Sequence, residues 1–62
     1  MIHKQLNRIL KKQKISGYRL SLDTGITQVQ IWKYRKGKAT PRMQNLVKIA
    51  NALDVRTDDL LK

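Results

Sequence analysis

The sequence contains no cysteine and a single histidine, His3. Disulfides and thiolate metal sites are therefore excluded, and a histidine-based metal site has no support. Only four side chains are acidic, so the chain offers no credible acid–base pair or nucleophile for catalysis. We expect a protein that is not an enzyme and that needs no cofactor.

Long apolar runs are also missing. No segment approaches the roughly 20 residues of a transmembrane span, and no signal peptide is present. Strand patterns, repeats, linkers and low-complexity segments are absent as well. These features predict one soluble, intracellular domain over residues 1–62, which by its size buries only about 60% of its unfolded surface.

Positive charge is abundant and lies on one part of the chain. The net charge is +10. Residues 1–42 contain eleven lysines and arginines and one acid, whereas residues 43–62 contain three cations and three acids. A basic surface of this kind favours a polyanionic partner.

The hydrophobic spacing predicts five short helices and an all-α fold. We expect them at about Ile2–Lys12, Gly17–Thr24, Gln28–Arg35, Arg42–Leu53 and Thr57–Leu61. Their apolar stripes predict a core made of Ile2, Leu6, Ile9, Leu10, Leu20, Ile26, Ile31, Tyr34, Met43, Leu46, Val47, Ile49, Ala50, Leu53 and Val55.

The segment from residue 17 to 35 has the pattern of a helix-turn-helix. Ser16 and Thr27 occupy N-cap positions, where their hydroxyls can accept from orphan backbone N–H groups. Gly25 and Gly37 can adopt the positive φ of a tight turn and of a helix C-terminus. The second helix of such a motif enters the DNA major groove.

Residues near the fourth and fifth helices support their boundaries. Pro41 fits the first turn of a helix. Asp54 tolerates left-handed geometry better than most residues. Asp58 and Asp59 lie at the start of the last helix, where the helix dipole favours acids.

The chain resembles the lambda-repressor-like (Xre, or phage Cro-like repressor) family over nearly all its length. The matching features are the Ser16-capped helix, Ser21, Gly25-Ile26-Thr27, Ile31, Tyr34, Gly37-Lys38, Pro41, LVKIANALDV and DDLL. The resemblance implies a five-helix DNA-binding domain and a transcriptional repressor. It also implies a homodimer on a palindromic operator, in contact through the C-terminal region around residues 55–61 and the loop 36–42.

Gln28, Val29 and Lys33 are the candidate base-reading residues. They lie in the first turn and on the outward face of the third helix. Family members often contact bases from the corresponding positions. Gln can pair with adenine, Val can contact a thymine methyl, and Lys can donate to guanine.

Phosphate contacts are expected from two regions. The first is the start of the second helix, where backbone amides can bind an anion. The second is the basic loop after the third helix. The predicted residues are Ser16, Gly17, Tyr18, Arg35, Lys36, Lys38, Thr40 and Arg42.

The chain departs from the family pattern at several positions. Gly17 replaces a usual Gln, and Thr24 replaces a usual apolar residue, which predicts slightly weaker packing. A family ion pair corresponds here to Leu10 and Arg35, which leaves Arg35 free to bind phosphate. Tyr18, Leu22 and Trp32 are expected to face outward, either as isolated apolar side chains or as a protein-contact patch; Trp32 has the further option of packing on Gln28 or the sugar–phosphate backbone.

Sequence-specific DNA repression is thus the leading hypothesis, in the cytoplasm of a bacterial or phage-infected cell and in association with the nucleoid. The alternative is an antitoxin- or anti-repressor-like module that uses the same fold to hold a regulatory protein. A nonspecific nucleic-acid-coating protein and a membrane-active peptide are weaker alternatives. The 62-residue length suits a short Cro-like protein or a fragment of a longer one.

Overall fold

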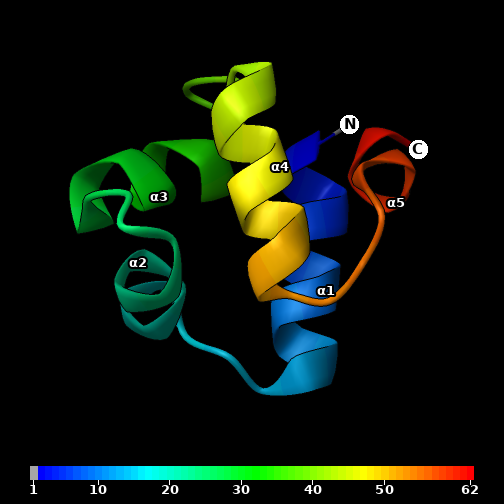
Figure 1. Ribbon diagram of the computed structural model, residues 1–62. Helices are drawn as coiled ribbons and strands as arrows, with labels where there is room; N and C mark the ends of the chain where they lie inside the picture. The colour runs from blue at the N-terminus through cyan, green and yellow to red at the C-terminus, as the bar shows by residue number, and fades with distance from the viewer. Residues whose placement is uncertain (1) are drawn as a thin grey trace.

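The computed structural model describes residues 2–62 as five helices, with no strand among them (Figure 1). The helices are α1 (Ile2–Gln13), α2 (Gly17–Thr24), α3 (Gln28–Arg35), α4 (Met43–Ala52) and α5 (Thr57–Leu61). The all-α prediction is confirmed. The expected bounds agree for α2, α3 and α5, and α1 is one residue longer than expected. Met1, the first residue of the predicted domain, lies outside the described residues.

Side-chain caps define the start of both helices of the helix-turn-helix. The Ser16 hydroxyl accepts from the Arg19 amide at 3.0 Å, and the Thr27 hydroxyl accepts from the Gln30 amide at 3.2 Å. Gly25 ends α2 with a φ of 76°. Each hydroxyl pairs with a backbone N–H that the first turn of a helix leaves without a partner. Gly25 adopts a positive φ that the Cβ of another residue would oppose. The predicted caps are confirmed.

Left-handed residues also follow α1, α3 and α4. Gly37 has a φ of 73° and Asp54 a φ of 55°, as expected. Lys14 also has a positive φ, 57°, which the sequence did not lead us to expect. After Lys14 and after Asp54, the next amide donates to a carbonyl five residues earlier, which closes the C-termini of α1 and α4.

The expected bounds of α4, Arg42–Leu53, were wrong by one residue at each end, because Leu53 is the C-cap. Arg42 is extended, with φ −70° and ψ 163°, and serves as the N-cap, so the helix begins at Met43. Pro41 consequently precedes the helix and does not belong to its first turn. It is buried, and so it holds the end of the basic loop against the domain.

The core lies where the five helices meet. α1 contacts α3 and α5, α2 contacts α3 and α4, and α4 contacts α5. In Figure 1, α4 crosses in front of α1, with α2 and α3 on one side and α5 on the other. Apart from Pro41, the buried side chains among residues 2–62 form this core, and they are all apolar except for the tyrosine hydroxyl: Leu6, Ile9, Leu10, Leu20, Ile26, Ile31, Tyr34, Leu46, Ile49, Ala50, Leu53 and Leu60.

Two predicted core residues of α4 are exposed. Met43 is 62% exposed and Val47 is 40% exposed. At about 100° per residue, the buried side chains of α4 cover an arc of only about 100°, and these two lie beyond its edge. The hydrophobic spacing predicts that the whole apolar sector of α4 is buried. The neighbouring helices cover only part of that sector, so Met43 and Val47 remain exposed.

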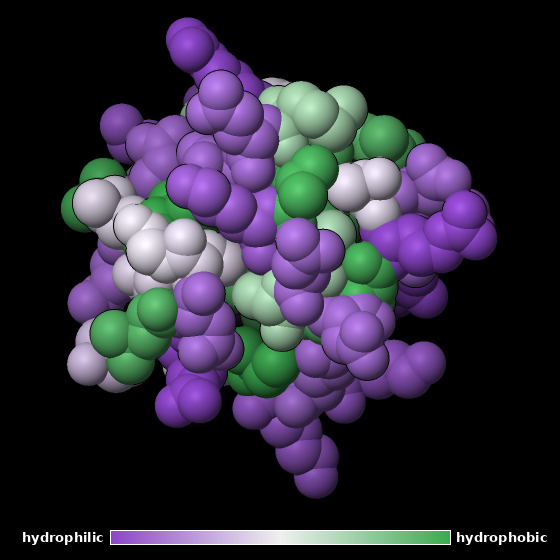
Figure 2. Space-filling model, viewed as in Figure 1, coloured by the Kyte–Doolittle hydropathy of each residue, from purple (hydrophilic) through white to green (hydrophobic). Residues whose placement is uncertain are grey.

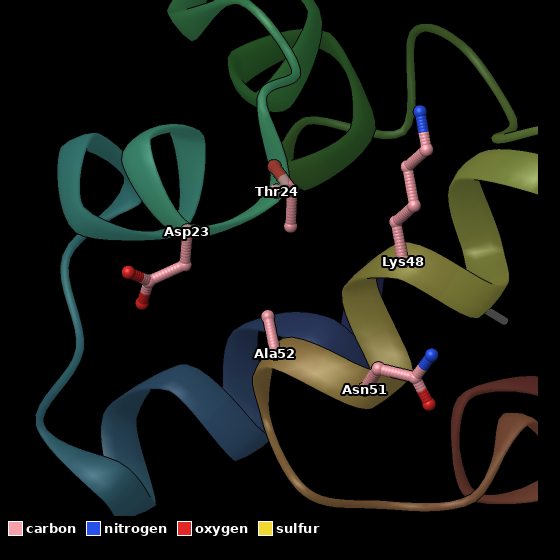
Figure 3. Close-up of a pocket in the computed structure, with 5 residues that line it drawn as sticks. All are labelled: Asp23, Thr24, Lys48, Asn51 and Ala52. Carbon is pink, nitrogen blue, oxygen red and sulfur yellow. The ribbon is translucent and has the colours of Figure 1, made fainter.

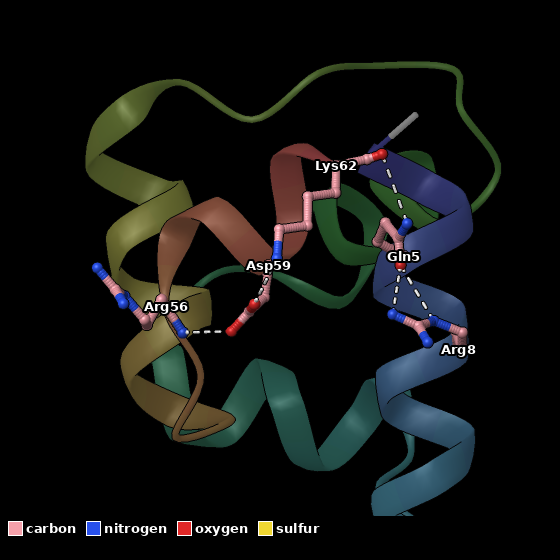
Figure 4. Close-up of polar contacts among 5 residues, drawn as sticks. All are labelled: Gln5, Arg8, Arg56, Asp59 and Lys62. Atoms are coloured by element: carbon pink, nitrogen blue, oxygen red, sulfur yellow. Dashed lines mark hydrogen bonds and ion pairs between the residues drawn. The ribbon is translucent and has the colours of Figure 1, made fainter.

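Polar contacts join the C-terminal helix to the rest of the domain (Figure 4). The Gln5 amide donates to the Lys62 carbonyl at 3.5 Å, which brings the C-terminal residue beside α1. The Asp59 carboxylate accepts from the Arg56 amide at 3.0 Å, as an N-terminal acid of α5 should. None of the helices described here is long and apolar enough to cross a bilayer.

Candidate nucleic-acid interface

The three predicted base-reading residues lie together on the solvent side of α3. Gln28, Val29 and Lys33 are exposed, Val29 to 64%. On the opposite side, Ile31 and Tyr34 are 1% and 3% exposed. The buried side fixes the rotation of α3 about its axis, so the first turn presents one amide and one apolar side chain to solvent, and the next turn presents a cationic side chain.

Hydrogen bonds across the turn set the position of α3 relative to α2. The Ser21 hydroxyl donates to the Ile26 carbonyl at 2.6 Å. The Thr24 hydroxyl donates to the Leu20 carbonyl at 2.7 Å and accepts from the Ile26 amide at 3.2 Å. Thr24 therefore forms hydrogen bonds on both sides of the turn. The sequence predicts only weaker packing at this position, and these hydrogen bonds compensate for it.

The start of α2 forms the first predicted phosphate region. Ser16 is exposed and Tyr18 is 58% exposed. The hydrogen bonds found among residues 2–62 do not use the amides of Gly17 and Tyr18. These two donors belong to the group that helix geometry leaves available to an external acceptor.

The loop after α3 forms the second predicted phosphate region. Lys36, Lys38, Thr40 and Arg42 are all exposed. The Lys38 ammonium lies 5.7 Å from the centroid of the Trp32 ring, a cation–π contact that draws the loop towards α3. The loop thus exposes three cations and a hydroxyl, and Lys38 contacts α3.

Arg35 has no ion pair among residues 2–62, but it is hydrogen-bonded to Asn7, a contact that the sequence did not lead us to expect. Its Nε donates to the Asn7 side-chain oxygen at 2.9 Å, and the Asn7 amide donates to the Arg35 carbonyl at 2.8 Å. The sequence did not lead us to expect Asn7, because the family ion pair places Leu10, and not Asn7, opposite Arg35. The available signal was helical spacing, since Asn7 lies one turn before Leu10 on the same face of α1.

The predicted outward-facing apolar side chains are exposed. Tyr18, Leu22 and Trp32 are 58%, 59% and 48% exposed. Arg19 and Asp23, the residues that follow the first two in sequence, form an ion pair of 3.4 Å on the surface of α2. Figure 2 shows the same mixture on the face viewed in Figure 1, where hydrophilic side chains surround separate hydrophobic patches.

A hollow between α2 and α4 lies apart from these regions (Figure 3). Its lining consists of Asp23, Thr24, Lys48, Asn51 and Ala52. None of the predicted DNA-contacting residues lines it. Its polar and small side chains come from the end of α2 and the second half of α4, so it contributes nothing to the surface formed by α3 and the basic loop.

The charge along the chain makes the candidate interface electropositive. No acidic residue occurs between Asp23 and Asp54, a stretch that contains all of α3 and the basic loop. Because like charges there have no acidic neighbour in sequence, their field adds over α3 and the loop. The arrangement suits a polyanion with a groove wide enough to admit a helix.

Comparison with known proteins agrees with this geometry. The family model described as the Cro/C1-type HTH DNA-binding domain matches residues 5–62. No solved structure matches the chain at a significant level.

Two curated proteins are similar in sequence. The SPbeta prophage-derived uncharacterized HTH-type transcriptional regulator YonR of Bacillus subtilis is 37% identical over 62 residues, which are 100% of this chain and 57% of that protein. The cryptic phage CTXphi transcriptional repressor RstR of Vibrio cholerae is 45% identical over 38 residues, which are 61% of this chain and 34% of that protein. The aligned segment thus spans about half of one relative and a third of the other.

Proposed function

Because the chain belongs to the Cro/C1-type HTH DNA-binding domain family, we propose that it binds a specific site on double-stranded DNA and represses transcription there. The observation that carries the proposal is the exposure of Gln28 and Val29 in the first turn of α3, and of Lys33 in the next turn, on a helix fixed by its buried face. The similarity to a transcriptional repressor and an HTH-type regulator, both of phage origin, supports the same role.

In this proposal α3 lies in the major groove and each of its three residues contacts a base pair. Gln28 donates to adenine N7 and accepts from its N6 amino group, Val29 packs on a thymine methyl, and Lys33 donates to guanine O6 or N7. The positions in the first turn and on the outward face favour this assignment, since groove-binding helices contact bases from there.

Phosphates on either side of the groove fix the position of α3. The amides and hydroxyl at the start of α2 bind one strand, and Lys36, Lys38, Thr40 and Arg42 bind the other. Such contacts give affinity and orientation without distinguishing sequences. The exposed cations and the unused amides support this division of roles.

The proposed DNA-bound form is a homodimer on a palindromic site in the cytoplasm, at the nucleoid. Its contact region is α5 with the loop 36–42. Leu61, on α5, is 52% exposed, which gives this region an apolar side chain that a partner subunit could cover. Two-fold symmetry of the protein would then require two half-sites about one helical turn apart.

Selection of binding sites from random duplex DNA tests the proposal. We expect enrichment of one consensus sequence with two inverted half-sites. A consensus without inversion would contradict the dimer but retain specific binding. Recovery of no consensus would contradict specific binding itself.

A second candidate function is an antitoxin- or anti-repressor-like module that holds a regulatory protein. The observation in its favour is the exposure of Tyr18 and Leu22, four residues apart on α2 and away from the core. Separate assays with duplex DNA and with candidate protein partners distinguish the two functions. A tight protein complex without DNA binding would favour the module.

A further inference from the structure

Asn7 and Arg35 form a two-way contact between α1 and α3. The Asn7 side-chain oxygen accepts from Arg35 Nε at 2.9 Å, and its amide nitrogen donates to the Arg35 carbonyl at 2.8 Å. Both groups are half-buried. Asn7 forms hydrogen bonds to both the backbone and the guanidinium of Arg35, so it fixes the direction of the Arg35 side chain. An arginine that is already fixed loses less rotamer freedom when it binds a ligand.

The fixed guanidinium lies beside Gly17, in the first turn of α2. A Cβ at residue 17 would lie 3.1 Å from Arg35 Nη1 and 3.7 Å from its Cδ. Gly17 does not have a positive φ, unlike Gly25 and Gly37, so its backbone does not need glycine. The missing side chain instead leaves the space that the guanidinium occupies.

The contact leaves the charge of Arg35 unneutralised. An amide orients a guanidinium without cancelling its charge, whereas a carboxylate would cancel it. No ion pair among residues 2–62 involves Arg35, and the hydrogen bonds there use its Nε but neither terminal nitrogen. Arg35 shares a surface hollow with Gly17, Tyr18 and Gln28, at the base-reading end of α3.

We propose that Asn7 is a positioning residue for DNA: it holds Arg35 so that the terminal nitrogens bind a backbone phosphate next to the start of α2. The inference rests on the proposed DNA binding and adds a residue of α1 to it. Arg35, on α3, and Gly17, on α2, then act as one unit whose geometry is set from a third helix. Guanidinium nitrogens are well suited to this task because they can donate to phosphate oxygens in pairs.

The test measures how affinity for a mixed-sequence DNA duplex falls with salt. Asn7→Ala removes no charge, yet we expect the slope of log affinity against log salt to shrink by about 0.9, the value for one lost phosphate contact. Gln13→Ala is the matched control, because it removes an amide-to-carbonyl hydrogen bond of 2.7 Å from the same helix without touching a cation. We expect the slope of the control to equal that of the wild type.

A double-mutant cycle separates positioning from simple structural support. Arg35→Gln should reduce the slope as much as Asn7→Ala does, and Asn7→Ala should add no further loss in the Arg35→Gln background. An unchanged slope in Asn7→Ala, or full additivity of the two changes, would overturn the proposal. Asn7→Asp serves if the alanine variant does not fold: its carboxylate still accepts from Arg35 Nε but cannot donate to the Arg35 carbonyl, and it neutralises the guanidinium. The same reduction in slope is therefore expected, and an unchanged slope overturns the proposal.

We expect Gly17→Ala to raise the thermal stability of the protein and to lower its affinity for DNA. Alanine should raise the thermal midpoint, since it is a better helix former than glycine. Its methyl group, 3.1 Å from Arg35 Nη1, should shift the guanidinium by a few tenths of an ångström and so weaken DNA binding. Stronger or unchanged binding would contradict the proposal. Failure of the wild-type protein to bind any duplex would instead refute the proposed function, so the two failures are distinguishable.

Discussion

Gln28 and Lys33 are the polar side chains of α3 that we expect to distinguish base pairs. Both are exposed on a helix whose other face is buried, so a substitution at either position leaves the core intact. A glutamine that pairs with a base should matter on one DNA sequence and not on others, whereas a phosphate contact should matter equally on all sequences. This difference separates the proposed roles residue by residue.

We expect Gln28→Ala to weaken binding to the selected site by about 1–3 kcal/mol and to change binding to random DNA little. The loss should map to one base pair in a panel of single-base variants of the site. Lys33→Ala should behave in the same way at a different base pair. Equal losses on selected and random DNA would contradict base reading by the residue concerned.

Lys38→Ala and Arg42→Ala should each weaken binding to selected and random DNA alike. Each removes one exposed cation of the basic loop, so the salt slope should fall by about one unit. Titrations at several salt concentrations measure it. A slope that does not change would show that the side chain stays in solvent, and for Lys38 that its contact with Trp32 is its main role.

The sequence predicted the roles of single residues well where the local backbone conformation determines those roles. Ser16, Thr27, Gly25 and Asp54 perform the capping and left-handed roles that their chemistry favours. It did less well where a side chain meets a distant part of the chain. The Asn7–Arg35 contact joins residues 28 apart, and no local pattern specifies it.

At the scale of helices, the core depends on a few side chains from each element. Ile31 of α3 is 1% exposed and Leu46 of α4 is 2% exposed. We expect Ile31→Ala and Leu46→Ala each to lower the free energy of unfolding by about 2–5 kcal/mol, because each leaves a cavity. Thermal or urea unfolding measures this loss.

Met43→Ala is the matched control for the core variants. Met43 is on the same helix as Leu46 but is 62% exposed, so its truncation should cost less than about 0.5 kcal/mol. Unfolding midpoints of Ile31→Ala and Leu46→Ala close to that of Met43→Ala would contradict the core assignment.

The outward face of α2 has its own prediction. The double variant Tyr18→Glu, Leu22→Glu should fold nearly as well as the wild type, because the two side chains are 58% and 59% exposed. If they form a protein-contact patch, binding of a regulatory partner should decrease more than DNA binding. DNA affinity must be measured in parallel, since Tyr18 also lies at a predicted phosphate region. A smaller loss for the partner than for DNA would contradict the patch.

Helix boundaries and faces followed from the sequence to different degrees. α2, α3 and α5 have the expected bounds because caps and acids mark their ends. Hydrophobic periodicity located the buried face of α4 but overestimated its width, since Met43 and Val47 are exposed. Periodicity shows which residues share a face, but the neighbouring helices decide how much of that face they cover.

At the scale of the molecule, the charge and the fold support each other. The net charge of +10 is confined in sequence to residues 1–42, which contain the helix-turn-helix and the basic loop. The family, the all-α fold and the position of α3 could be predicted from the sequence because capping, turn and core signals agree with one another. The predicted DNA contacts and the dimer stay predictions, since they depend on a partner that the chain does not contain.

Competition between the selected duplex and a mixed-sequence duplex, measured at several salt concentrations, decides whether the protein recognises a specific DNA sequence. We expect both affinities to fall with salt and the selected duplex to bind about 10³-fold or more tightly at physiological salt. Equal affinities for the two duplexes, or binding to neither, would contradict sequence-specific recognition by α3.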